Sequence, residues 1–475
     1  MDIFKSLKKE VGISKDYIFK TFLIDNTTVN IFFNEVLTSG DMINDFILRR
    51  LVILKSKQLN NLENEIPDRN ILIIGKDDVL DMVHNGYVVI IINNIIYAFE
   101  ERANLDRGIS EVKSELTIKG PKDAFSENFN INLGLIRRRI KTCDLRVYDF
   151  MIGRDTKTKV GILYMESIAD SNIISKVKEK LSTIDIDGII DSTYLKENLE
   201  SKNNNFFPTV MSTERPDKVS QALLEGKICI LVDNSPYVLI MPCFFIDFFH
   251  SVDDYYQKPI NTTFIRIIRL LAFFISIFVP ALYIMVTTHN HEFVNLDMLL
   301  SLKAQRDSAL FSAVTEAIFM MLCFEILRES DIRMSSTSGN AVSILGGLIL
   351  GDAAVSAGII SPIMIIITSI SAISGLTFTS IELVSAIRWW RLILIILAAV
   401  FGVEGIILGI GLLVVRLITI KNFGRKYLTP ICPFIKTEFK DNIFKSSNKG
   451  EKYRNPELTK NLKRGHYRWN MWNYF

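Results

Sequence analysis

The stretch LLAFFISIFVPALYIMVT, Leu270–Thr287, decides how this chain is organised. It has no charged residue, whereas the sequence before residue 260 is charged, rich in Asn and patterned like a soluble protein. A bilayer core of roughly 30 Å needs about 20 apolar residues of helix. Three further apolar runs follow, at Ser308–Leu327, Ile344–Ile381 and Leu392–Ile418. The sequence therefore predicts an α/β, water-facing first half and an all-α multipass membrane domain in the second half.

The C-terminal tail is strongly basic. From Lys421 to Phe475 there are thirteen Lys and Arg against four Asp and Glu, a net charge of +9. Nucleic acid is one reason for a basic tail, but a tail directly after an apolar run is better explained by the positive-inside rule. Arg266 and Arg269, before the first run, fit the same side, and the N-terminus has no apolar signal-peptide region. We expect two cytoplasmic termini, an even number of crossings and no nucleic-acid partner.

The soluble half contains an internal repeat. Two pairs of segments match in the same order: Asp16–Leu51 with Asp144–Leu181, and Asp78–Glu100 with Lys218–Ile240. The first pair aligns in one register, in which Val29, Ile31, Glu35 and Ile43 match Val160, Ile162, Glu166 and Ile174. In the second pair Gly86 and Gly226 each follow a predicted helix, as a C-terminal glycine does. This pattern predicts two α/β modules of related fold, with chance similarity of strand–turn–helix patterns as the alternative.

The predicted domains are module I at residues 1–140, module II at 141–258, a membrane domain at 259–435 and a basic cytoplasmic tail at 436–475. The membrane domain has five apolar segments: Leu270–His289, Ser308–Leu327, Gly339–Ala357, Ile359–Ile381 and Leu392–Ile418. Five crossing segments would not agree with the even number of crossings that two cytoplasmic termini require. We therefore expect four crossings and one re-entrant or interfacial segment, which is either Gly339–Ala357 or Ser308–Leu327.

No motif for catalysis is present. The sequence lacks a P-loop, a GxGxxG turn after a strand, HExxH and GxSxG. The densest group of metal-ligand residue types is His289-Asn290-His291-Glu292, but two His at i and i+2 do not share a helix face. We interpret this group as a polar loop at the far membrane surface. The sequence predicts no enzyme, no catalytic residue, no cofactor and no metal.

Three acids lie within the apolar runs: Glu316, Glu325 and Glu404. A charged group at the bilayer centre costs roughly 2.5–3.5 kcal/mol on insertion scales, so each acid needs a partner or water. Glu316 and Glu325 are nine residues apart and fall on opposite faces of a helix. Glu325 can pair with Arg328 or Arg306, whereas Glu404 has no basic residue nearby in sequence. An interhelical hydrogen bond is the preferred interpretation for each, with an ion site as the alternative.

Small residues recur on one face of Gly339–Gly358. The candidate pore-lining residues there are Ser343, Gly347, Gly351, Asp352 and Val355. Small side chains at every fourth position let helices approach closely, so ordinary helix packing is one interpretation. In a ring of identical subunits, such a helix near the axis would present a ring of acids, and acidic rings favour cations.

The segment from Arg215 to Pro259 is predicted to couple the soluble region to the membrane. It holds the last strands of module II and ends directly before the first crossing. Asp253, Asp254 and Pro259 are the candidate coupling residues, because a shift in the module has no other covalent route to the bilayer.

Long blocks of the sequence resemble the A subunit of the GerA-type spore-germination receptors. They include STERPDKVSQALLEGKICILVDNSPYVLIMP at Ser212–Pro242, SVDDYYQKP at Ser251–Pro259 and RLLAFFISIFVPALYIMVTTH at Arg269–His289. KGPKDAFSENFNINLGLIRRRI at Lys119–Ile140 is similar to the Gly-Pro-bearing segment of that family. The departures are Lys119, where Arg is expected, and Asp123-Ala124, where Glu-Gly is usual. The resemblance covers about residues 15–435.

The resemblance implies a receptor in the inner membrane of a dormant spore. Such an A subunit assembles with a transporter-like B subunit, which holds the germinant pocket, and with a lipoprotein C subunit. It is also expected to form a homo-oligomeric ring in membrane lipid that acts as a nutrient-gated cation channel. Two alternatives stay open: a non-conducting scaffold of the receptor, and a small transporter with a cytoplasmic regulatory domain, although transporters usually have more spans.

Overall fold

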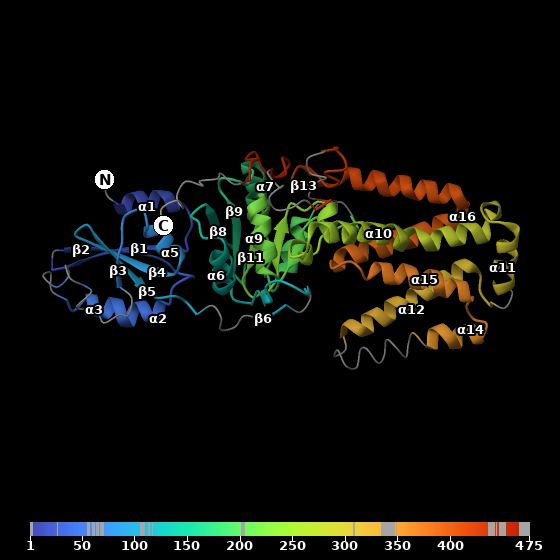
Figure 1. Cartoon of the computed structure of the whole chain (residues 1–475), viewed down its shortest axis with the longest axis horizontal. Helices are drawn as coiled ribbons and strands as arrows, with labels where there is room; N and C mark the ends of the chain where they lie inside the picture. The colour runs from blue at the N-terminus through green and yellow to red at the C-terminus, as the bar shows by residue number, and fades with distance from the viewer. Residues whose placement is uncertain are drawn as a thin grey trace.

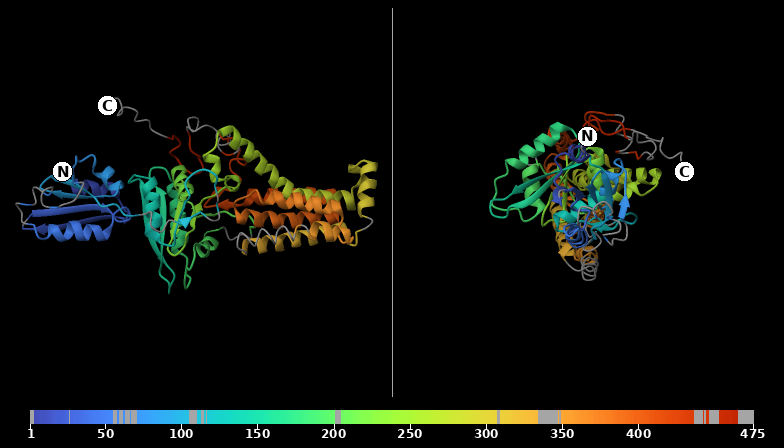
Figure 2. Two further views of the ribbon diagram at one scale, coloured as in Figure 1. Left: turned by 60° about the horizontal axis from the view of Figure 1, so that its bottom comes forward. Right: turned by 90° about the vertical axis from the view of Figure 1, so that its left-hand side faces the viewer.

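The structure is a computed structural model of the whole chain. It describes residues 3–25, 27–54, 58, 62, 66, 71–104, 110–112, 115, 117–200, 205–306, 309–333, 347, 349–435, 442, 444–445 and 453–464. The molecule is elongated, and a first sheet, a second sheet and a helical region follow one another along its length (Figures 1 and 2). An α/β first half and a helical second half are therefore confirmed.

The first sheet has five strands in the order β1-β2-β4-β5-β3, all antiparallel. Its central strands are rich in β-branched residues and buried, as the run YVVIII in β4 shows. The elements are α1 (Ile3–Val11), β1 (Tyr17–Ile24), β2 (Thr27–Asn34), α2 (Gly40–Met42), the π-helix η1 (Ile43–Leu48), α3 (Arg49–Leu51), β3 (Ile71–Ile73), α5 (Val79–His84), β4 (Tyr87–Ile92) and β5 (Ile95–Glu100).

The second sheet has the order β10-β12-β11-β9-β8 and is also antiparallel. Short 3₁₀ turns lead from it to the helical region. The elements are β6 (Ser110–Glu111), β7 (Asp123–Ala124), α6 (Phe129–Arg139), β8 (Leu145–Ile152), β9 (Thr158–Met165), α7 (Ser171–Ser182), α8 (Ser192–Leu199), β10 (Met211–Thr213), α9 (Pro216–Glu225), β11 (Ile228–Val232), β12 (Val238–Met241), η3 (Phe245–Phe249) and η4 (Val252–Tyr255).

The two sheets share one topology. Read from β8, the second sheet has the order β8-β9-β11-β12-β10, which places each strand where its counterpart lies in β1-β2-β4-β5-β3. The register also agrees, because Val29 pairs with Ile92 in the first sheet and Val160 pairs with Val232 in the second. Gly86 (φ +84°) directly follows the C-cap residue of α5, and Gly226 (φ +95°) is the C-cap residue of α9. The two sheets therefore agree in strand order and in register, which is the pattern expected from the repeat.

Helix α6 packs with the second sheet. Phe129, Leu133 and Ile136 on this helix share one core cluster with Leu145 of β8 and Val219 of α9. The boundary predicted at residue 140 assigns α6 to module I, whereas this helix packs against elements of module II. A boundary chosen from sequence similarity alone cannot detect this, because the helix lies between the two repeated segments.

The helical region contains the apolar runs. Among the residues that the structure describes, α10 and α16 are the two helices long and apolar enough to cross a membrane. The elements are α10 (Pro259–Thr288), η5 (His291–Phe293), α11 (Leu296–Arg306), α12 (Ala313–Arg333), the π-helix η6 (Ile349–Ala353), α14 (Ala354–Ser356), α15 (Pro362–Gly375) and α16 (Ile381–Thr419), and the short strands β13 (Lys421–Asn422) and β14 (Arg425–Lys426) follow.

Helix α16 is a hairpin of two antiparallel halves. A straight helix of 39 residues would be about 58 Å long, yet both of its ends lie at the second sheet. Glu382, at its start, pairs with Lys196 of α8, and Asn422, just after its end, donates to the carbonyl of Thr209. The chain reverses at Gly402, the one residue inside α16 with non-helical backbone angles (φ +57°, ψ −130°). The prediction of Leu392–Ile418 as one crossing is therefore wrong.

The polar group at residues 289–292 holds this reversal in place. Asn290 Oδ1 accepts a hydrogen bond from the Val403 amide at 3.0 Å, and His289 Nε2 donates to the carbonyl of Ala399 at 2.7 Å. These two hydrogen bonds give the group at 289–292 a structural role at the end of the bundle away from the sheets.

We expect Gly402→Val to disrupt the hairpin. A side chain there would lie 2.5 Å from Asn290 Oδ1 and 2.9 Å from His289 Cβ, and the positive φ adds strain for a β-branched residue. Hydrogen exchange of residues 395–410 in the purified chain should rise. Gly411→Val is the matched control, because nothing lies within 4 Å of that position. Equal exchange in both variants would contradict a structural role for Gly402.

Part of the basic tail packs on the second module. Arg454 Nε donates to the carbonyl of Leu224 at 3.0 Å, and Leu458 is buried in a small cluster with Phe244 and Ile246. Arg425, which follows the helical region, pairs with Asp170 at 2.5 Å. The described residues 453–464 are thus a docked segment, and the end of the helical region is fixed to the same module.

We expect the stability of module I to fall below neutral pH because of His84. Burial, and then the charge of Arg137, lower the pKa of His84 to about 4, and its ring accepts or donates a 2.8 Å hydrogen bond with Tyr17. The unfolded histidine titrates near 6.5, so the unfolded state binds more protons between about pH 6.5 and 4. Stability is therefore lost across this range, by at most about 3 kcal/mol. His84→Gln should weaken the pH dependence of hydrogen exchange in β4; an unchanged dependence would contradict this assignment.

Candidate functional site

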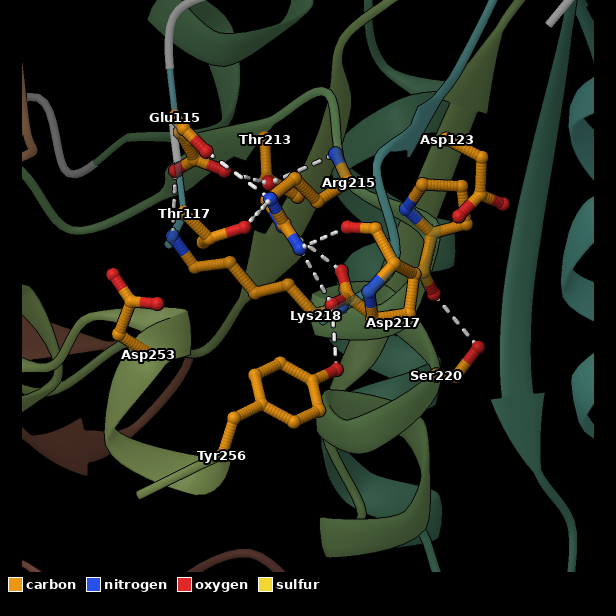
Figure 3. Close-up of polar contacts among 12 residues, drawn as sticks. Glu115, Thr117, Asp123, Thr213, Arg215, Asp217, Lys218, Ser220, Asp253 and Tyr256 are labelled. Carbon is orange, nitrogen blue, oxygen red and sulfur yellow. Dashed lines mark hydrogen bonds and ion pairs between the residues drawn. The ribbon is translucent and has the colours of Figure 1, made fainter. Parts of the chain in front are cut away.

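Three segments meet between the second module and the first long apolar helix. They are the loop at residues 115–123, the N-terminus of α9, and η4, which lies directly before α10 (Figure 3). The loop and α9 are separated by about 100 residues in the sequence. We call this meeting point the junction, and it is the place where a movement of the module would reach α10.

Arg215 is the centre of the junction. Arg215 is fully buried. Its guanidinium donates to Thr117 Oγ1 at 3.0 Å and to the carbonyls of Glu115 at 3.2 Å and Pro121 at 2.8 Å (Figure 3). It also forms a fork with Asp217, with distances of 3.1 and 2.8 Å. Arg215 occupies the N-cap position of α9, where the proline that follows fixes the first helical residue. One side chain therefore fixes the loop to the start of α9.

Tyr256 connects η4 to the same cluster. Its hydroxyl donates to Asp217 Oδ2 at 2.8 Å (Figure 3). Asp253 Oδ1 accepts from the Ile118 amide at 3.2 Å. Gly120 has φ +116°, and a Cβ there would lie 2.6 Å from the Tyr256 ring. Only glycine permits both this backbone conformation and this approach. The glycine of the KGP segment is therefore required by the junction.

The electrostatics keep Asp217 ionised. Burial alone would raise the pKa of this carboxyl, but hydrogen bonds from Arg215 and Tyr256 lower it below its usual range. Burial, and then the bond to Asp217, raise the pKa of Tyr256, so its phenol stays protonated. The donor and the acceptor are thus both in the correct protonation state at neutral pH.

Asp254 fixes η4 to α10. Its carboxylate is 2% exposed and pairs with Arg266 at 3.1 Å and Arg269 at 2.9 Å, both on α10. Thr262 Oγ1 donates to the Asp254 carbonyl at 3.1 Å. Pro259 occupies the first turn of α10, where its missing amide hydrogen causes no loss. The first turns of α10 are therefore anchored to the residues that also contact α9 and the loop.

The structure places the three candidate coupling residues Asp253, Asp254 and Pro259 at the junction and at the start of α10. Sequence reasoning missed the charged centre at Arg215 and Asp217 and the contribution of the loop. The quoted blocks RPD, KGP and DDYY contained all of these residues. Their contact could not be inferred, because spacing along the chain gives no distance between separate loops.

We expect Tyr256→Phe to weaken the junction by about 1 kcal/mol, because it removes one hydrogen bond to a carboxylate at a partly exposed position. Thermal unfolding of the full chain and hydrogen exchange of η4 should both show the change. The loss should vanish in an Asp217→Asn background, since the partner charge is then absent. Tyr194→Phe, at an exposed position on α8, is the control and should have no effect.

The three candidate acids lie apart. Glu316 is fully buried, and its carboxylate accepts from Ser361 Oγ at 2.7 Å, which is an interhelical bond between α12 and the start of α15. Glu325 pairs with Arg388 at 2.8 Å and with Arg328 at 3.7 Å. Glu404 is exposed just after the reversal of α16. The partner Arg328 was among those expected for Glu325, whereas Arg388 comes from a distant helix.

The candidate pore-lining residues are only partly described. Ser343 lies outside the described residues. A Cβ on Gly347 or Gly351 would meet no atom within 4 Å, and Asp352 is exposed, whereas Val355 is half-buried. Among the described residues, Gly347 and Gly351 therefore have open space beside them, and Gly347 also lines a cavity of the helical bundle.

The fold and the junction define a class of protein: a two-module α/β region anchored by buried ion pairs to a bundle that contains long apolar helices. Residues 5–457 match the family described as Bacillus/Clostridium GerA spore germination protein. The chain belongs to the GerA family, as the sequence blocks predict.

Two relatives and one solved structure illustrate the match. The chain is 36% identical to spore germination protein KA of Bacillus subtilis, over 92% of this chain and 82% of the relative. It is 32% identical to spore germination protein GerQA of Bacillus cereus, over 94% of this chain and 89% of the relative. The crystal structure of the N-terminal domain of the A subunit of the Bacillus megaterium spore germinant receptor GerK3 aligns with 51% of this chain and 93% of that chain, at 29% identity and a TM-score of 0.38.

Proposed function

We propose that this chain is the A subunit of a nutrient germinant receptor in the spore inner membrane, and that copies of it form a nutrient-gated cation channel that triggers germination. Membership in the GerA family supports the receptor role. The junction is the observation that carries the gating role, because it offers a fixed mechanical path from the two modules to α10. Partner subunits of the transporter-like B type and the lipoprotein C type belong to the same proposal.

The directions of the helices support a multipass arrangement with both termini on the side of the sheets. α10 leads away from the second module, and the halves of α16 lead away and back. α12 and α15 start together at the far end, since Ser361 at the start of α15 contacts Glu316 at the start of α12. We propose an even number of passes, with the sheets and the basic flanks in the cytoplasm.

The small-residue segment supports the pore proposal. Gly347 and Gly351 have open space at the Cβ position, and Asp352 is exposed beside them. Small residues with open space beside them, as Gly347 and Gly351 have among the described residues, permit close contact with another copy. In a ring, the copies of Asp352 would then give the cation preference of an acidic constriction.

Reconstitution of the purified receptor and recording of single-channel current test the pore. We expect Gly351→Leu to lower the conductance at least tenfold, because it adds four carbon atoms at the narrowest face. Asp352→Asn should reduce the preference for cations over anions. Gly411→Leu is the matched control, since this glycine on α16 also has open space around it. An absence of current with wild-type protein would favour the non-conducting scaffold, and normal current in Gly351→Leu would place the pore elsewhere.

A further inference from the structure

A cavity of about 250 Å³ lies within the helical bundle, away from the junction, and Gly347 of the small-residue segment is among its lining residues. Its apolar lining residues include Phe324, Leu327 and Leu376. Its charged lining residues include Arg328 of α12 and Arg388 and Arg391 of α16. The cavity thus offers both apolar and cationic side chains, the combination that an amphipathic ligand contacts.

The charges in the cavity do not balance. Three guanidinium groups face it, and among its described lining residues only Glu325 is acidic. Glu325 lies 2.8 Å from Arg388, 3.7 Å from Arg391 and 3.7 Å from Arg328, so one carboxylate serves all three. A net charge of +2 in an apolar bundle is costly unless an anion compensates it.

Two of the arginines also retain donors for that anion. Arg391 is 6% exposed, and its Nη1 donates to Ser371 Oγ at 3.0 Å. Ser371 in turn donates to the Ser276 carbonyl at 2.7 Å, so the guanidinium is held in one position. Within the described part of the chain, the buried Nε atoms of Arg391 and Arg388 donate to no acceptor. Buried donors are nearly always satisfied, which indicates that a ligand completes this site.

The depth of the cavity indicates the kind of ligand. α16 starts at the second module, and Arg388 and Arg391 follow its first residue by about 10 and 15 Å along the axis. The polar interfacial layer of a bilayer is roughly 5–8 Å thick on each side. The guanidinium groups therefore lie near the boundary between headgroups and acyl chains on the side of the sheets.

We propose that this cavity binds an anionic phospholipid, with the phosphodiester between Arg388 and Arg391 and an acyl chain against the apolar lining residues. A phosphate oxygen pair matches the planar fork of a guanidinium, and such charge-assisted bonds are strong. The bound monoanion lowers the net charge of the cavity from +2 to +1. The inference depends on the proposed membrane placement but not on ion conduction.

Native mass spectrometry of the full chain in a nonionic detergent tests the site, with phosphatidylglycerol, phosphatidylcholine and inorganic phosphate as probes. Wild-type protein should retain one phosphatidylglycerol, with at least tenfold preference over phosphatidylcholine. Arg388→Gln/Arg391→Gln should lower phosphatidylglycerol affinity at least tenfold. Arg416→Gln is the matched control, since this arginine lies on the same helix near the same interface but does not line the cavity.

A second variant separates ligand loss from misfolding. Ala372 lines the cavity, so Ala372→Phe fills the space and leaves all the charges in place. It should also lose the lipid while the protein elutes as wild type. Equal binding of the two lipids, or unchanged binding in both variants, would overturn the proposal. Complete displacement of the lipid by millimolar phosphate would assign the site to a free anion and overturn the lipid assignment. Current recordings are separate, so loss of conduction with intact lipid binding would affect only the proposed function.

Discussion

Replacing Asp254 with alanine is expected to abolish the nutrient response, and it is the junction variant with the largest effect. The substitution leaves Arg266 and Arg269 at the start of α10 without their shared carboxylate, and the Arg266 side chain is only 2% exposed. Removing one partner of a buried ion pair typically costs about 3–5 kcal/mol. We expect the cost to appear as local separation of η4 from α10, so hydrogen exchange should rise in the first turns of α10.

A second junction variant, Asp253→Ala at the neighbouring position, is compared with it and should have a smaller effect. Asp253 is half-buried and accepts from the Ile118 amide at 3.2 Å, so its loss should cost about 1 kcal/mol. Spores with each variant are compared for receptor level by immunoblot and for potassium release after nutrient addition. Normal release in Asp254→Ala spores with normal receptor level would remove the coupling role. Asp254→Glu distinguishes a stability defect, because it keeps the charge, and partial rescue is expected.

The repeated sheets could be predicted because their signal is local. The strand before Asn93-Asn94 and the strand before Asp233-Asn234 are continuous apolar runs, and each follows a glycine that ends a helix. Buried strands fix their register through which side chains reach the core, so the sequence match carried over to the pairing of β2 with β4 and of β9 with β11. The helix α6 has no counterpart in that comparison, and its packing was missed.

The reversal of α16 could not be predicted from hydropathy. The run contains Gly402, Gly405, Gly409 and Gly411, and nothing in the sequence marks one of them as a turn. A hydropathy profile is the same for one long apolar helix and for two apolar helices joined by a tight turn, because both halves lie in apolar surroundings. The information lies in Asn290 and His289, more than 100 residues earlier, which hold the turn.

Only part of the junction could be predicted from the sequence, because only part of its signal is local. Asp253 and Asp254 stand next to Pro259 and the first apolar run, so proximity to the membrane could be inferred. The contacts of Arg215 with Thr117 and Pro121 join residues almost 100 positions apart, and single-sequence reasoning contains no distance of that kind. The excess of positive charge around Glu325 could not be predicted from the sequence either, because Arg388 and Arg391 belong to another helix.

Arg137→Met is the second variant with a large expected effect, and it acts on the contact between the two modules. Arg137 on α6 is 0% exposed and forms a fork with Asp16 in front of β1, at 2.8 and 3.1 Å. Burial would lower the pKa of Arg137, but Asp16 raises it above its ordinary value, so the pair is ionic. Removing the cation leaves a buried carboxylate, and we expect a loss of about 3–5 kcal/mol.

A double-mutant cycle separates the pair from the general effect of shortening a side chain. Asp16→Asn in the Arg137→Met background removes the orphaned charge and still offers an oxygen to Asn34, which donates to Asp16 Oδ2 at 2.8 Å in the wild type. We expect it to recover at least half of the loss in thermal unfolding of the full chain. Arg139→Met, on the same helix, removes a 2.5 Å pair with Asp123 that is about one-fifth exposed, and it should cost less than about 1 kcal/mol. If Arg137→Met costs no more than Arg139→Met, the two modules are held together by their apolar contacts, and the ion pair serves neither stability nor the transfer of movement from module I.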